Sequence, residues 1–173
     1  LAVHGKSPED IHQTLGLRAI GHAGDYTDFS RLDRRLLGRL LPSGWYLLIS
    51  RDCAHKMLED ASMAAISTGC DAVRCAVEEH VMFAVSALWR NGAMVWLVEH
   101  ESERGDRDLK AMGALPTEFE ATVARITAES DAAQDDQADF FFDIPLILAK
   151  NQVGFRHDEG EPARTKDFQW LEL

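Results

Sequence analysis

The chain has 173 residues and a mass of 19.3 kDa, a length typical of a single domain. It carries 18 basic and 29 acidic residues, and the resulting net charge of −11 argues against binding to nucleic-acid phosphates or to an anionic membrane. With 46% hydrophobic and 27% charged residues the chain is not of the disordered class, and its charge favours a basic protein as partner.

The three cysteines, Cys53, Cys70 and Cys75, are an odd number without a Cys-x-x-Cys spacing. This pattern argues against a disulfide framework and against a zinc site of thiolates, and it favours a reducing compartment. The first residues do not form an intact signal peptide, and the apolar run at 81–89 is too short to cross a bilayer. We therefore expect a cytoplasmic protein with no membrane contact and no cofactor.

The first fifty residues predict a strand, a short helix and a basic segment. Residues 1–3 are typical of a strand, and Ser7 as N-cap with Pro8 at the first helical position predicts a helix that ends at Gly16. Residues 22–44 combine a basic cluster with leucines, which predicts at least one helical turn. We favour a solvated helix face over a site for phosphate or acidic peptide; the cluster consists of Arg31, Arg34, Arg35 and Arg39.

The next segment predicts a central strand and a helix. Residues 45–50 are a continuous apolar run, which indicates a strand buried on both faces. Asp52 is a candidate N-cap for a helix whose apolar residues recur at three and four positions until Gly69. Cys53 is a candidate nucleophile, because a helix N-terminus lowers the pKa of a thiol and His55 is close in sequence. We favour a small core residue at this position.

The strongest local signal is a hairpin at about 81–101. Asn91-Gly92 favours a two-residue type I′ turn between two apolar runs. Upstream, residues 73–77 alternate as a third strand, which either turns at 79–80 or continues through a bulge. The turn predicts that Trp89 faces Met94, Ala87 faces Trp96, Val85 faces Val98 and Phe83 faces His100, with Leu88, Val95 and Leu97 on the second apolar face.

The remaining residues predict helices and a final strand or tail. Thr117 with Glu120 resembles a capping box, and the helix it starts extends to about Ser130. Residues 143–145 indicate a turn into a short helix. Residues 157–166 indicate a mobile charged loop, and residues 168–171 indicate an edge strand or a docked tail. The expected fold class is α+β. We predict a single domain over 1–173 whose antiparallel or mixed sheet has the hairpin at its centre and packs against helices.

Two groups of polar residues are candidate sites. The first gathers histidines and carboxylates at the expected end of the hairpin, and it predicts either a metal site or a polar sheet margin, the second being favoured. The metal alternative uses Glu78, His80, Glu99, His100 and Glu101, with Glu79 between them.

The second group is an acidic tract at 118–143, with eight acidic residues against Arg125 alone. Such a field steers a basic partner, and adjacent phenylalanines supply aromatic anchors, although a solvated helix and loop explains the charge equally well. The expected partner-binding residues are Asp131, Asp135, Asp136, Asp139, Phe140, Phe141 and Asp143.

These features lead to three functional hypotheses. The favoured one is a small acidic protein-binding domain without catalysis, of the type of a bacterial immunity or antitoxin protein that inhibits a basic toxin. The second is a small metal-dependent hydrolase that uses the histidine and carboxylate group, although no common catalytic motif is present in the sequence. The third is a homodimer or other homo-oligomer built on the second face of the hairpin.

Overall fold

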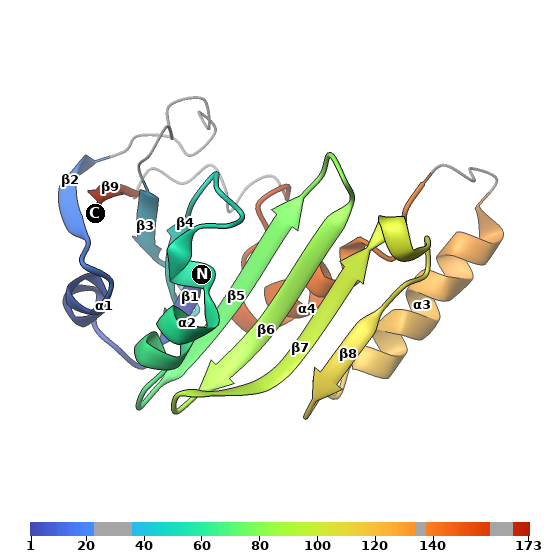
Figure 1. Ribbon diagram of the computed structural model, residues 1–173, viewed down its shortest axis with the longest axis horizontal. Helices are drawn as coiled ribbons and strands as arrows, with labels where there is room; N and C mark the ends of the chain where they lie inside the picture. The colour runs from blue at the N-terminus through green and yellow to red at the C-terminus, as the bar shows by residue number, and fades with distance from the viewer. Residues whose placement is uncertain (23–35, 134–137, 160–167) are drawn as a thin grey trace.

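The computed structural model describes residues 1–22, 36–133, 138–159 and 168–173. Within them the chain forms one nine-stranded antiparallel sheet in the order β2-β9-β3-β4-β1-β5-β6-β7-β8, together with α-helices (Figure 1). The predicted α+β class is confirmed, although the sheet is much larger than a central hairpin. The strands are β1 (Ala2–His4), β2 (Arg18–His22), β3 (Leu36–Leu40), β4 (Tyr46–Ile49), β5 (Asp71–Glu78), β6 (Phe83–Arg90), β7 (Ala93–Glu101), β8 (Lys110–Gly113) and β9 (Gln169–Glu172).

Helices cover parts of both faces of the sheet. Figure 1 shows α2 (Asp60–Ile66) in front of the sheet near β1 and β5, whereas α3 (Phe119–Ala132) and α4 (Asp143–Val153) lie behind it. The first helix, α1 (Pro8–Leu15), packs at the front through Ile11. Each face therefore has its own apolar core. None of the described helices is long and apolar enough to cross a membrane.

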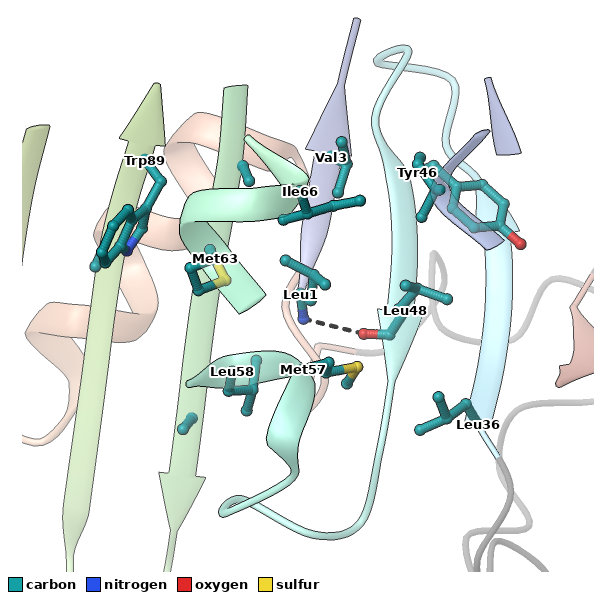
Figure 2. Packing of buried hydrophobic residues seen from close by; sticks show 14 of the residues in the cluster. Leu1, Val3, Leu36, Tyr46, Leu48, Met57, Leu58, Met63, Ile66 and Trp89 are labelled. Carbon is teal, nitrogen blue, oxygen red and sulfur yellow. Dashed lines mark hydrogen bonds between the residues drawn. The ribbon is translucent and has the colours of Figure 1, made fainter. Parts of the chain in front are cut away.

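The core on the α2 side is drawn in Figure 2. It brings Leu1 and Val3 of the first strand segment together with Leu48, Met63 and Ile66, and all of these side chains are buried. The core on the opposite side is built from alternate residues of the same strands, such as Ala2, Leu47 and Val73, and from α3 and α4. This alternation confirms that the apolar run at 45–50 is an interior strand buried on both faces.

The predicted start of the chain is confirmed in detail. The Ser7 Oγ accepts a hydrogen bond from the Asp10 N–H at 3.1 Å, Pro8 is the first helical residue, and Gly16 ends the helix in the left-handed conformation. The strand before this helix, β1, pairs with β4 on one side and with β5 on the other. A strand of three residues thus occupies the middle of the sheet.

The predicted hairpin has the correct turn and the wrong register. Asn91 and Gly92 both have positive φ, and Arg90 pairs with Ala93, as a type I′ turn requires. A bulge at Val95 then shifts the register by one residue, so that Ala87 faces Leu97 and not Trp96. The corrected pairs place Val85 opposite Glu99, Phe83 opposite Glu101 and Ala84 opposite His100.

The bulge also explains a glycine in the neighbouring strand. The Val95 carbonyl accepts a hydrogen bond from the Ala114 N–H at 2.8 Å, and a Cβ on Gly113 would collide with that carbonyl. Gly113 has a φ of 85°, which disfavours any other residue as well. The irregular β7–β8 pairing therefore depends on Gly113.

Several predicted element types and boundaries need correction. Of the 22–44 segment, residues 36–40 form a strand that pairs with β4, and residues 23–35, where the expected helical turn could lie, are outside the described residues. The helix expected after Asp52 begins only at Asp60, after a 3-10 turn, η2 (Lys56–Leu58). The predicted capping box is absent, since the Thr117 hydroxyl contacts Glu118 and no side chain caps α3.

The end of the chain is also placed differently from the expectation. The last strand, β9, lies between β2 and β3 and is therefore an interior strand, not an edge strand or a tail. Upstream, β5 and β6 are separate antiparallel strands, which settles the choice at 79–80 in favour of a turn. The loop predicted at 157–166 falls largely outside the described residues, which stop at Glu159 and resume at Phe168.

Candidate functional site

The described acidic residues of the 118–143 tract are mostly paired within the fold. Asp131 forms an ion pair with Arg107 at 2.5 Å, Asp143 with Arg156 at 2.7 Å, and Glu129 pairs with an arginine on its own helix. Asp135 and Asp136 lie outside the described residues. The tract is thus less available to a basic partner than its sequence suggests.

The aromatic residues next to the tract do not form exposed anchors. Phe141 and Phe142 are buried, and Phe140 is half-buried against the same core. Phe141 packs in the core on the α3 and α4 side, beneath the guanidinium of Arg107. The expectation that Phe141 binds a partner is therefore corrected: it is a core residue that holds the start of α4 against the sheet.

Asp139 is buried and hydrogen-bonded to a buried histidine. Its Oδ2 lies 2.8 Å from Nε2 of His100, and its Oδ1 accepts from the Phe142 N–H at 3.2 Å. The Nδ1 of His100 lies 2.7 Å from the carbonyl oxygen of Asp108. The side chain of His100 is fully buried and that of Asp139 is 7% exposed. Both side chains therefore belong to the protein interior and not to a surface that a partner could contact.

The hydrogen bonds of His100 define where its protons are. A carbonyl oxygen only accepts, so Nδ1 must carry a proton and donate it to Asp108. The other nitrogen faces a carboxyl group, and a hydrogen bond there needs a proton on Nε2 or on Asp139. The two hydrogen bonds of His100 tie three segments together: β7, the loop before β8 and the turn before α4.

The residues of the metal alternative do not converge. His100 points to the α4 side of the sheet, whereas its neighbours Glu99 and Glu101 point to the α2 side and pair with Arg104. His80 is exposed in the turn after β5, and Glu78 accepts a hydrogen bond from the thiol of Cys53. Among the described residues no group of three or more His, Cys, Asp or Glu side chains is placed to hold a metal ion.

Cys53 does not have the properties of an activated nucleophile. Burial, followed by the negative charge of Glu78, raises the pKa of its thiol above the ordinary value. No α-helix begins at this position, and His55 turns its Nδ1 to the Met57 N–H at 3.2 Å. The predicted lowering of the Cys53 pKa is therefore wrong, because its cause, a helix N-terminus, lies seven residues further along the chain.

The basic cluster is only partly described. Arg39 lies in β3 with its side chain largely buried, and its guanidinium stacks over the ring of Phe168 at 5.5 Å. Arg31, Arg34 and Arg35 lie outside the described residues. For Arg39 the expected solvated helix face is wrong, since this residue belongs to the sheet.

The part of the sheet that helices leave uncovered was not foreseen. In Figure 1 no described α-helix lies in front of β7 and β8, whereas α2 contacts β6. The side chains there form what we call the open face. Its apolar members are half-buried or exposed apart from buried Leu97, and Met112 is 42% exposed. The open face comprises Phe83, Met94, Leu97, Glu99, Glu101, Lys110 and Met112.

Charged side chains line one end of the open face. Arg104 bridges Glu99 and Glu101 at 3.3 and 2.6 Å, and Lys110 lies 3.6 Å from Glu99. These pairs are partly exposed, and such pairs typically contribute only about 0–1 kcal/mol each. A partner with its own charged groups can therefore displace them at little cost.

A cavity of about 560 Å³ lies elsewhere, between β4 and β5. Its lining combines apolar residues such as Leu47 and Leu146 with charged residues such as Arg51 and Arg156, and desolvation raises the pKa of the half-buried Cys75 thiol to about 11. The amino group of Leu1 is fully buried at this site, and burial lowers its pKa to about 6. Burial therefore disfavours the charged form of both of these groups.

Comparison with protein-family models, with curated proteins and with solved structures found no match to this chain. The candidate sites consequently rest on the geometry of the described residues. Two of them were missed from the sequence, namely the open face and the buried histidine pair. The open face could not be predicted because the bulge at Val95 decides on which side of the sheet Leu97 lies. The pair could not be predicted because it is a contact between residues 39 positions apart in the sequence.

Proposed function

We propose that this chain is a non-catalytic protein-binding domain that masks a basic protein partner, in the manner of an immunity or antitoxin-type inhibitor. The observation that carries the proposal is the apolar character of the open face. Antiparallel sheets commonly present polar side chains on a face that no helix covers. Here Phe83, Met94 and Met112 occupy such positions, and an apolar patch with charged residues at its margin is typical of a protein interface.

The chemistry of the open face suits a protein more than a small ligand. Methionine side chains are flexible and polarisable, and they adapt to irregular apolar surfaces. Glu99 and Glu101 place carboxylates beside this apolar area, where they can pair with arginines of the partner. The net charge of −11 adds a long-range attraction that accelerates association with a basic protein.

The proposed interface is the open face and not the acidic tract at 118–143. Asp131 is held in an ion pair and Phe141 lies in the core, whereas no described helix covers the half-buried and exposed apolar side chains of the open face on β7 and β8. The oligomer face expected from Leu88, Val95 and Leu97 is also divided, because the first two lie in the core behind the sheet and Leu97 lies in front.

The test is a matched pair of surface variants. Met112→Arg places a bulky cation on the open face, and Leu40→Arg makes the same change at a residue that is 58% exposed on β3, far along the sheet. The immobilised chain is exposed to a lysate of its source organism, and each retained protein is identified, purified and measured for direct binding. We expect a basic protein whose affinity falls at least tenfold with Met112→Arg and stays unchanged with Leu40→Arg.

Two results would contradict the proposal. The first is a partner that binds equally well to both variants, which would place the interface elsewhere. The second is concentration-dependent dimerisation of the unmodified chain in sedimentation that Met112→Arg abolishes, because the open face would then be covered by a second copy.

A further inference from the structure

The sheet contains a slot that continues its central strand, β1, beyond Leu1. In β1, Ala2 faces Leu47 of β4 and Val73 of β5. Beyond Leu1 both neighbouring strands continue, β4 to Ile49 and β5 to Glu78, and the 560 Å³ cavity lies between them. The slot therefore lies between β4 and β5, the two strands that pair with β1 on either side of it.

The strand edges in the slot are arranged for pairing. On their outer edges Ile49 pairs with β3, and residues 75–78 pair with β6. On the inner edges, no described residue pairs with β5 beyond Arg74 or with β4 beyond Leu48. Continuing the register of β1, three further positions would face Ile49 and Cys75, then Ser50 and Ala76, then Arg51 and Val77. A strand in the slot would thus gain partners on both sides at once.

The backbone of Leu1 already has ladder geometry. Its nitrogen donates to the Leu48 carbonyl at 3.0 Å (Figure 2), and its carbonyl accepts from the Leu48 N–H at 2.7 Å. A peptide N–H at this nitrogen would make the same hydrogen bond without bringing a charge into a fully buried position. The site consequently suits an amide more than an ammonium group.

The first two positions of the slot face apolar residues. Side chains of a strand alternate between the two faces, and Leu1 belongs to the α2-side core whereas Ala2 belongs to the α4-side core. The position that continues the strand from Leu1 therefore points to the α4 side, where Leu146 and Ala149 line the cavity. The position after it points to the other side, towards Met57.

We propose that this slot is a strand site, which takes about three residues of extended polypeptide joined to the amino end of Leu1 and pairs them with β4 and β5. Continuity with β1 selects this occupant, because joined residues enter the slot in register and without the entropy cost of a second molecule. The proposal does not depend on the partner of the open face, which lies on other strands.

The test compares two chains that are extended before Leu1 by three residues. One carries Thr-Val-Val, which offers apolar side chains and backbone donors, and the other carries Thr-Pro-Pro, which cannot donate to a ladder. Both extensions convert the Leu1 amine into an amide, so a difference between them reports strand pairing. Hydrogen exchange of the backbone amides at 49–51 and 75–77 is measured by mass spectrometry or NMR.

We expect exchange at least tenfold slower in these segments for Thr-Val-Val than for Thr-Pro-Pro, with a higher urea midpoint. Equal exchange in the two chains would overturn the strand site. A free acetyl-Thr-Val-Val-amide peptide at millimolar concentration is added to the chain that starts at Leu1. Equal protection by this free peptide would overturn the choice of joined polypeptide, and its failure to protect supports that choice.

Discussion

The buried pair of His100 and Asp139 gives the sharpest prediction about stability. Asp139→Ala removes the partner of a fully buried imidazole and the acceptor of the Phe142 N–H at 3.2 Å. Breaking a buried pair by removing one member typically costs about 3–5 kcal/mol. With a urea slope of about 2 kcal/mol per M, the midpoint of unfolding should fall by about 1.5–2.5 M.

Asp139→Asn is the informative partner of this variant. The Asn side chain keeps an oxygen for the Phe142 N–H, and its amide group can donate to Nε2 of a neutral imidazole while Nδ1 still donates to Asp108. We therefore expect Asp139→Asn to cost only about 0.5–1.5 kcal/mol, the scale of a single hydrogen bond.

Urea unfolding followed by circular dichroism measures both variants, with Asp131→Ala as the control in the same region. Asp131 pairs with Arg107 at the surface, where both side chains are more than half exposed, so its removal should cost at most about 1 kcal/mol. A loss below 1 kcal/mol for Asp139→Ala, or an equal loss for Ala and Asn, would refute the stabilising role assigned to the hydrogen bonds of the pair.

Three further changes test other parts of the structure. Gly113→Ala should destabilise the fold by about 1–3 kcal/mol more than Gly105→Ala in urea unfolding, because both have positive φ but only Gly113 meets the Val95 carbonyl. Burial lowers the pKa of His12 below 6.5, so the unfolded chain binds this proton more readily and stability falls as pH drops through 6.5. His12→Gln should reduce the stability difference between pH 7.5 and 5.5, and an unchanged difference would contradict this origin. Met112→Arg should change the free energy of unfolding by no more than about 0.5 kcal/mol, and a larger loss would show that Met112 is a core residue.

Local signals in the sequence predicted local structure well. Ser7, Pro8 and Gly16 bound the first helix as expected, and Asn91-Gly92 forms the expected turn, because each of these residues acts through its own backbone conformation. The bulge at Val95 has no such local signal. One extra residue moved Leu97 to the other face of the sheet, and with it the composition of both surfaces.

The candidate site was harder to predict for the same reason. Charge and aromatic content around 118–143 suggested a surface, but Asp139 and Phe141 are held inside by His100 and by the core, which are distant in sequence. Conversely, Met112 looked like an ordinary apolar residue of a short segment. Its exposure follows from the arrangement of the described helices, which cover β7 and β8 on one side only.

The claim that the open face binds a protein is tested most directly by a hydrogen-exchange footprint of the chain in complex with the purified partner. The account predicts slowed exchange in β6, β7 and β8 around Phe83, Leu97 and Met112, together with an association rate that falls as salt is raised. A footprint confined to α3 and the turn before α4, with β8 unprotected, would contradict it.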